Sequence, residues 1–235
     1  MEGKRVGRRR TKRLMKPRQE SFEFPNGWGG RRTGAGPKPK GKQAGVSHRT
    51  RAALAACFPV HVTMKVRDGL PSLRRPHEFA ALRAAIAAGC ERGRFRLVHF
   101  SVQSNHMHLL VEGGCREALA RGLQGLAVRM ARALNRVWRR WGRVFADRYH
   151  DHILRSPREV WNALRYVLCN ARKHGGWSSR TRHDPCSSAA WFDGWRDSQP
   201  EPVESSITAR ARTWLLRKGW RRRGLLTLED APDPS

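Results

Sequence analysis

Two strand-like segments joined by a tight turn constrain the fold of this chain more than any other feature. Residues 95–103, FRLVHFSVQ, alternate between two sets of side chains with a period of two, and residues 104–112, SNHMHLLVE, open on a Ser-Asn pair that is typical of turns. This period places successive side chains on opposite faces of a strand. The pair of segments therefore predicts a β-hairpin.

Further segments extend this plan toward both ends of the chain. Residues 58–66, FPVHVTMKV, show the same alternation and predict a strand, and residues 142–156 predict another extended segment. Residues 76–93 predict a helix between the first strand and the hairpin, because Pro76 lies near its start and Gly93 near its end.

Two longer helices flank the last extended segment, and a final helix is expected near the C-terminus. Residues 116–141 carry apolar side chains at helical spacing on one face and arginines over the rest of the surface. In the other helix Ser156 can cap the first turn, Glu159 closes a capping box and Gly175 ends the helix. The order strand, helix, strand, strand, helix, strand resembles the split βαβ plan, an α+β fold with an antiparallel sheet and helices on one face.

The charge of the chain points to a polyanionic partner. Lys and Arg number 48 against 19 Asp and Glu, so the formal net charge is +29. Each cation that neutralises a phosphate releases condensed counterions, which favours any polynucleotide. Anionic membranes attract the same charge, but no run of about 18 apolar residues exists to span one, so we expect a soluble protein without a membrane partner.

Residues 1–50 combine basic runs with Gly and Pro and predict a disordered basic arm, which would act either as a solubility tail or as a non-specific phosphate-binding arm. The first twenty residues lack the apolar stretch of a secretion signal, so we expect a cytoplasmic, nucleoid-associated protein. The five cysteines form no CxxC pair, which predicts neither a disulfide framework nor a cysteine-ligated zinc site.

His106 and His108 are the first candidates for chemistry. Residues two apart on a strand share a face, so both imidazoles could ligate one metal ion while Met107 anchors the opposite face in the core. Two histidines on a solvated strand face would produce the same pattern, and the spacing alone leaves both readings open. A second pair, His150 and His152, encloses Asp151, which is not expected to anchor the opposite face in a core. The first pair is therefore the better-built platform, and the second could simply face phosphate or solvent.

Tyr166 is the second candidate. It lies off the apolar stripe of its predicted helix, and Asn170 follows one turn later on the same face. An amphipathic surface tyrosine would look the same. A phenol and a ligand oxygen that reach one metal ion would, however, suit phosphoryl chemistry, in which the phenol attacks a phosphodiester.

Three segments together resemble the HUH single-tyrosine transposases, especially the REP-associated tyrosine transposases. They are VQSNHMHLLVE, the long basic helix, and RYVLCNARKHG, and the resemblance covers about residues 48–175. It implies a ferredoxin-like sheet, metal ligands at His106 and His108, a nucleophile at Tyr166 and a third ligand at Asn170. It also implies Mg²⁺ or Mn²⁺ as cofactor and cleavage of hairpin-forming single-stranded DNA through a 5′-phosphotyrosine.

The predicted domains follow from this resemblance: the arm at 1–50, a catalytic domain at 51–176 and a partly helical C-terminal extension at 177–235. The basic side chains predicted to bind DNA are Arg121, Arg129, Arg132, Arg136, Arg139, Arg140 and Lys173. The aromatic cluster Trp191, Phe192 and Trp195 could stack on unpaired bases or pack in the core. Family members act as dimers or singly, so monomer and homodimer both stay open.

Two other function classes remain possible from the sequence. One is a non-catalytic basic nucleic-acid-binding protein in which the histidines are structural. The other is a different HUH endonuclease, either a relaxase or a replication initiator. Formation of a covalent protein–DNA product separates an enzyme from a binding protein.

Overall fold

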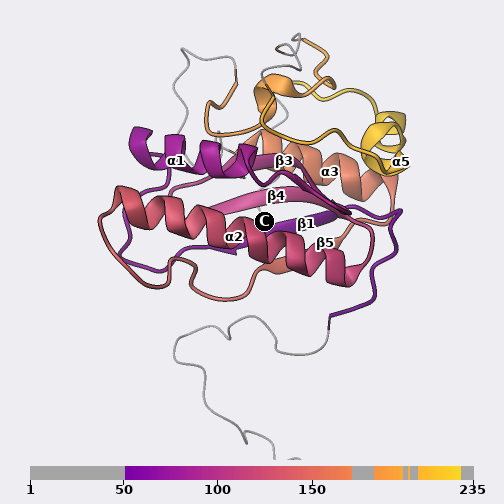
Figure 1. The fold of residues 1–235 in the computed structure, drawn as a ribbon. Coiled ribbons are helices and arrows are strands. Elements are labelled where there is room, and N and C mark those ends of the chain that lie inside the picture. Colours follow the sequence, from indigo (N-terminus) through magenta and orange to yellow (C-terminus); the bar gives the residue numbers. More distant parts are fainter. Residues whose placement is uncertain (1–50, 171–182, 198–200, 202–205, 229–235) are drawn as a thin grey trace, which may run out of the picture. The chain divides into compact units, whose positions relative to one another are not determined.

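The computed structural model describes residues 51–170, 183–197, 201 and 206–228, so the predicted basic arm at 1–50 lies outside the described residues. The fold is α+β, as predicted, with a five-stranded sheet in the order β2-β3-β4-β1-β5 and antiparallel pairing throughout (Figure 1). The strands are β1 Val60–Lys65, β2 Glu91–Arg92, β3 Phe95–Val102, β4 His106–Gly113 and β5 His150–Ile153.

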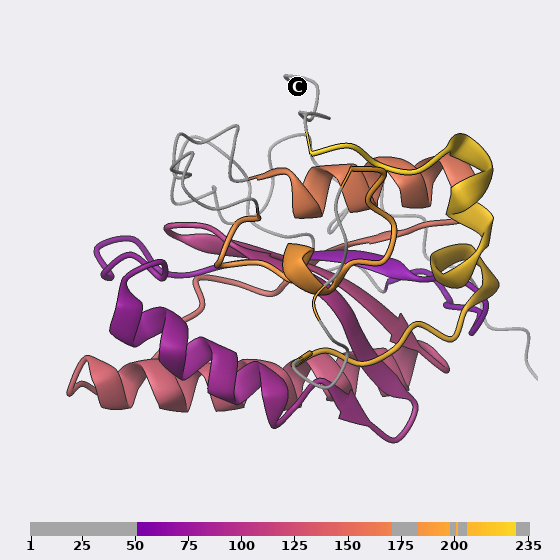
Figure 2. The same cartoon turned by 90° about the horizontal axis from the view of Figure 1, so that it is seen from above.

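Helices lie on both faces of this sheet, so the prediction of helices on one face is wrong for α3 (Figure 2). The long ones are α1 Pro76–Ala87, α2 Arg116–Val137 and α3 Pro157–Leu168, and the C-terminal segment adds α5 Trp214–Arg217 and the 3-10 turns η1 Ala189–Trp191 and η3 Gly219–Arg223. Helices α1 and α2 share one apolar core with the sheet, whereas α3 packs in a second core on the opposite face. None of the helices in the described ranges has the length and apolarity that crossing a membrane would require.

The period of two decides which face each strand residue occupies. Val62, Met64 and Met107 are buried against α1 and α2. The residues that alternate with them along β1 and β4 point toward α3. The alternation predicted through residues 97–103 is wrong at one point. A register shift between Leu97 and His99 is a β-bulge, so Val98 joins the α3 core whereas Leu97 lies with Phe100 on the other face.

Three predicted helix ends differ from the structure. The first helix ends at Ala87, and Gly93, with φ of 56°, turns the chain between β2 and β3 instead of ending a helix. The second helix ends at Val137. The capping box of α3 is confirmed, since Ser156 accepts from the Glu159 N–H and the Glu159 side chain accepts from the Ser156 N–H. Helix α3 ends at Leu168, and Gly175, the predicted end, lies outside the described residues.

The described part of the C-terminal segment covers the outer edge of β3. The Val102 N–H donates to the Cys186 carbonyl at 2.8 Å, and the Ser188 N–H donates to the Phe100 carbonyl at 2.9 Å. Further along, the Ala209 N–H donates to the Leu97 carbonyl at 2.9 Å. Backbone groups that a sheet edge would otherwise expose are therefore paired by this segment.

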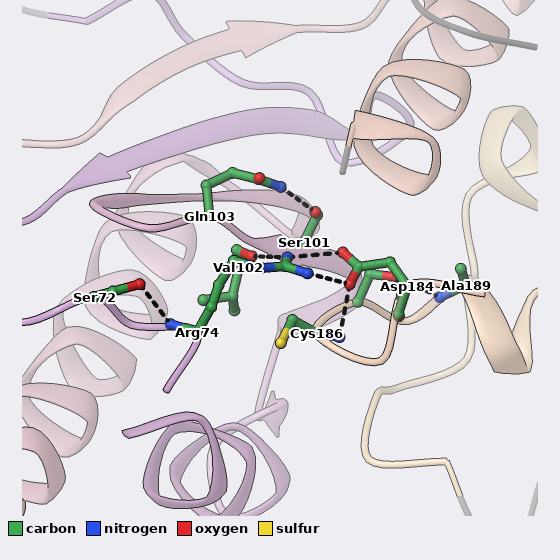
Figure 3. Close-up of polar contacts among 9 residues, drawn as sticks. Ser72, Arg74, Ser101, Val102, Gln103, Asp184, Cys186 and Ala189 are labelled. Atoms are coloured by element: carbon green, nitrogen blue, oxygen red, sulfur yellow. Dashed lines mark hydrogen bonds and ion pairs between the residues drawn. The ribbon is translucent and has the colours of Figure 1, made fainter. Parts of the chain in front are cut away.

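An ion pair between the partly buried Arg74 and the buried Asp184 ties this segment to the loop before α1 (Figure 3). Arg74 donates to both carboxylate oxygens of Asp184, at 2.7 and 3.0 Å, and to the Val102 carbonyl at 2.7 Å. Asp184 also accepts from the Cys186 N–H at 3.0 Å. The hydrogen bonds to Asp184 raise the pKa of Arg74, and burial raises the pKa of the Cys186 thiol to about 11.

Asp184→Asn should lower the free energy of unfolding by about 3 kcal/mol, because it removes the negative charge that accepts two hydrogen bonds from the partly buried Arg74 guanidinium. Urea titration followed by circular dichroism measures the loss. Asp193→Asn is the matched control, since its carboxylate also pairs with an arginine, Arg221, but is 75% exposed. The control should lose less than about 1 kcal/mol, and equal losses in the two variants would mean that the Arg74–Asp184 pair does not hold the segment.

Candidate active site

A cluster of histidines lies on the sheet face that α3 covers. Strand β4 contributes His106 and His108, and Met107 between them is fully buried on the other face, as the strand period predicts. The register pairs His108 with Thr63 of β1, and it pairs His61 of β1 with His152 of β5. Three adjacent strands therefore bring imidazoles to one place.

His106 and His108 converge through their Nε2 atoms, which are 3.1 Å apart. The Nδ1 atoms face oxygens instead, because His106 Nδ1 is 2.8 Å from Asn105 Oδ1 and His108 Nδ1 is 3.1 Å from Thr63 Oγ1. If each Nδ1–H donates to its facing oxygen, each Nε2 carries a lone pair, which is the tautomer that a metal ligand needs. Two ligands of one octahedral cation at about 2.1 Å also lie about 3 Å apart, so this geometry fits a divalent metal.

His61 is a site residue that the sequence analysis did not single out. Its Nε2 lies 3.3 Å from His108 Nδ1, and its ring centroid is 5.8 Å from that of Tyr166. Burial and then the neighbouring His152 lower the pKa of His61 to about 4, so this imidazole is neutral at pH 7. The alternation of residues 58–66 had already placed His61 and Thr63 on one face, and this was the available signal.

Helix α3 places Tyr166 directly against the histidine cluster. The Tyr166 ring meets the His108 ring edge to face, with centroids 4.9 Å apart and planes at 80°. Tyr166 also borders a groove of about 410 Å³ together with His61, His152, Asn162 and Arg165. The structure therefore brings together the predicted nucleophile and the predicted metal pair, which lie in different elements.

Asn170 is helical but lies beyond Cys169, the C-cap of α3, so the predicted continuous helix through Tyr166 and Asn170 is interrupted at Cys169. Its side chain is nevertheless fully buried, and neither the amide oxygen nor the amide nitrogen has a hydrogen-bond partner. A buried amide without partners is costly unless something else satisfies it, and the amide oxygen could donate a lone pair to a metal ion. Within the described ranges, no three His, Cys, Asp or Glu side chains form a metal-binding group, so a third ligand would be of another type.

The second histidine pair borders the same groove. His150 and His152 are exposed on β5, and His152 lines the groove beside Tyr166. Asp151 holds this strand through charge, not through an apolar core: its carboxylate pairs with Arg51 at 2.7 Å and with Arg116 at 2.6 Å. Ion pairs therefore hold β5 in place, whereas burial of the apolar Met107 side chain holds β4.

The arginines predicted to bind DNA are not gathered around Tyr166. Arg121, Arg129, Arg132 and Arg136 lie on α2, which packs on the sheet face opposite α3, and Arg139 and Arg140 follow in the next loop. Lys173 lies outside the described residues. Of the aromatic cluster, Phe192 and Trp195 are buried in the α3 core, so they pack and are not available for stacking on bases.

Comparisons with known proteins support the fold. No family model matches the sequence, and no curated protein matches it. Solved structures do match. One is a REP-associated tyrosine transposase bound to a REP hairpin. It is 18% identical, with a TM-score of 0.50, and the match covers 61% of this chain and 82% of that chain. At this identity the likeness concerns the fold, and the roles of individual residues depend on the geometry above.

Proposed function

We propose that this protein cleaves and rejoins single-stranded DNA through a 5′-phosphotyrosine at Tyr166, as an HUH-type single-tyrosine transposase on a ferredoxin-like sheet. One observation carries the proposal: the Tyr166 ring lies against His108, whose Nε2 converges with that of His106. The solved transposase with a similar fold was bound to a REP hairpin, which supports hairpin-forming DNA as the substrate class.

In the proposed reaction the Tyr166 phenol loses its proton and its oxygen attacks a phosphodiester. The new bond joins that oxygen to phosphorus, the P–O3′ bond breaks, and the 3′-oxygen takes up a proton. A 3′-hydroxyl reverses the step by attacking the phosphotyrosine and releasing Tyr166. The bond energy is kept throughout, so neither ATP nor water is consumed.

His106 and His108 would hold a divalent cation through Nε2, with the Asn170 amide oxygen as the proposed third ligand. Such a cation, Mg²⁺ or Mn²⁺, polarises the phosphate and stabilises the charge of the transition state. A set of nitrogen and oxygen ligands does not select between these two ions. Thr63 and Asn105 keep the two imidazoles in the orientation that metal binding needs.

The test of this function is covalent. Hairpin oligonucleotides carrying a 5′ or a 3′ label are incubated with the protein and Mg²⁺ or Mn²⁺, and the products are separated under denaturing conditions. A protein-linked product is expected with the label on the 3′ side of the cut, because the tyrosine retains the 5′-phosphate. EDTA should prevent the product, and a basic binding protein without a nuclease site would yield none under any condition.

A relaxase or replication initiator remains the second candidate, because the same histidine and tyrosine geometry would serve it. The transposase reading expects the isolated adduct to transfer its DNA to a second 3′-end. The same assay on purified monomer and dimer fractions would show whether Tyr166 acts on the site of its own chain.

A further inference from the structure

The loop that follows α2 carries an aromatic side chain, Trp141, that is almost fully exposed to solvent. Trp141 is 93% exposed, compared with 49% for Trp214, which is the next most exposed large apolar side chain within the described ranges. A tryptophan that contributes little to a core is typical of a binding surface, because its large face gains free energy only on contact with a partner.

Exposed arginines lie close to this tryptophan along the chain and in the neighbouring loop. Arg139 and Arg143 flank it in the sequence and are exposed, and Arg67 of the neighbouring loop is exposed as well. Two acidic residues lie nearby, but Asp68 is paired with Lys65 at 3.2 Å, and Asp147 accepts from the Arg148 N–H at 2.7 Å. An exposed aromatic ring among arginines is the combination that binds unpaired nucleotides, with the ring stacking on a base and the cations holding phosphates.

The loop is held in place by specific contacts. The Asn135 amide donates to the Gly142 carbonyl at 2.9 Å, the Arg67 N–H donates to the Val144 carbonyl at 2.8 Å, and the Ala146 N–H donates to the Lys65 carbonyl at 2.9 Å. A platform that is already ordered loses little entropy when it binds a ligand.

An arginine occupies a backbone position that favours glycine. Arg139 has φ of 47°, and it ends α2 in a Schellman motif: its N–H donates to the Arg136 carbonyl at 3.3 Å, and the Arg140 N–H donates to the Asn135 carbonyl at 3.0 Å. Glycine adopts this left-handed conformation without the Cβ clash that other residues meet. Arginine at this position is therefore expected to lower the stability of the fold relative to glycine.

The loop lies beside the candidate active site. Lys65, which accepts from the loop, is the residue of β1 paired with His106 of β4, and the next residue, Val66, donates to the Asn105 carbonyl at 2.9 Å. In Figure 1 the chain leaves α2 at the same side of the sheet where β4 begins. Only the end of β1 therefore separates the backbone at His106 from the segment that continues this loop.

We propose that the loop of residues 139–143 is a second DNA contact, in which Trp141 stacks on an unpaired base while Arg139 and Arg143 hold the flanking phosphates. The ligand is single-stranded DNA that continues from the site at His106. The proposal rests on the proposed function for the identity of the substrate, but it concerns binding and needs no cleavage.

The experiment measures binding in EDTA, so that no adduct can form. Fluorescence anisotropy follows a labelled oligothymidylate and a blunt duplex of equal length, for the parent and for the Trp141→Ala and Trp141→Phe variants. Trp141→Ala should weaken oligothymidylate binding by about 5- to 150-fold, the range for one stacked base, while duplex affinity changes less than about 2-fold. Trp141→Phe should recover most of the loss.

Trp214→Ala is the matched control, because it removes another exposed tryptophan that also lies beside an arginine, with Arg222 4.9 Å from its ring. It should leave oligothymidylate affinity within about 2-fold of the parent. An equal loss in both tryptophan variants, or no loss in Trp141→Ala, overturns the proposal. If Trp141→Ala instead loses binding to phosphatidylglycerol vesicles and keeps oligothymidylate binding, the loop contacts a membrane and the proposal also fails.

Arg139→Gly gives an independent readout. Removal of the left-handed arginine should raise the melting temperature by several degrees, and loss of one phosphate contact should reduce the slope of log K against log salt by about 0.7 for a single strand. A more stable variant with an unchanged salt slope would show that Arg139 does not contact a phosphate. These measurements follow DNA binding in EDTA, whereas the covalent assay follows cleavage in Mg²⁺ or Mn²⁺. Either test can therefore fail while the other succeeds, so failure of this proposal is distinguishable from failure of the proposed function.

Discussion

Tyr166→Phe should form no covalent product with hairpin DNA, a loss of about 10⁴-fold or more in the rate of adduct formation. The variant removes only the phenol oxygen, which is the atom that would bond to phosphorus. The edge contact of the ring with His108 needs no hydroxyl, so the fold and the affinity for DNA should stay as in the parent. Denaturing gels of labelled oligonucleotides in Mn²⁺ measure the adduct, and anisotropy in EDTA measures binding.

The chain offers a close control, since its only other tyrosine is Tyr149. Its hydroxyl is buried without a hydrogen-bond partner, and its ring lies 3.7 Å below the Arg51 guanidinium. Tyr149→Phe should therefore fold well and form the adduct at the parent rate. If Tyr166→Phe still forms the product and Tyr149→Phe does not, the nucleophile is misassigned.

His108→Ala should reduce cleavage by about 10³-fold or more, because a metal ion contributes several kcal/mol of transition-state stabilisation. His106→Ala should behave in the same way. Binding of DNA should persist in both variants, since the arginines of α2 lie on the other face of the sheet. Isothermal titration with Mn²⁺ in the absence of DNA gives a readout separate from activity, and both variants should lose the heat of metal binding.

Two further variants test whether the metal site lies at His106 and His108. Thr63→Val removes the oxygen 3.1 Å from His108 Nδ1 and should weaken metal binding by about 10- to 100-fold, because the imidazole loses the partner that orients it. His150→Ala should change little, since His150 is exposed on β5. A larger defect in His150→Ala than in His108→Ala would move the metal site to the second pair, and equal loss of binding and cleavage would indicate misfolding.

Much of the sheet could be predicted because a period of two is a local property of the sequence. The hairpin of β3 and β4 and the burial of Met107 followed from it directly. Strand β2 was missed, because Gly93 signals a chain reversal without saying whether a helix or a strand precedes it. The bulge between Leu97 and His99 was missed because an extra residue is visible only from the register of the partner strand.

The site was predictable in part for the same reason. That His106 and His108 share a face follows from one strand, and the contact between their Nε2 atoms agrees with it. The closeness of Tyr166 to His108 depends on how α3 crosses the sheet, which no local pattern encodes. His61 approaches His108 across 47 residues of sequence, so only the strand register identifies it as a neighbour.

The pairing of the C-terminal segment with β3 has a consequence for folding during synthesis. The strands of the sheet all lie before residue 154, whereas the partners of the β3 edge lie between residues 184 and 209. During synthesis the nascent sheet therefore leaves the ribosome with one edge unpaired until those later residues follow. An unpaired edge recruits strands from other chains, so premature termination in this interval should yield aggregates, not a smaller folded protein.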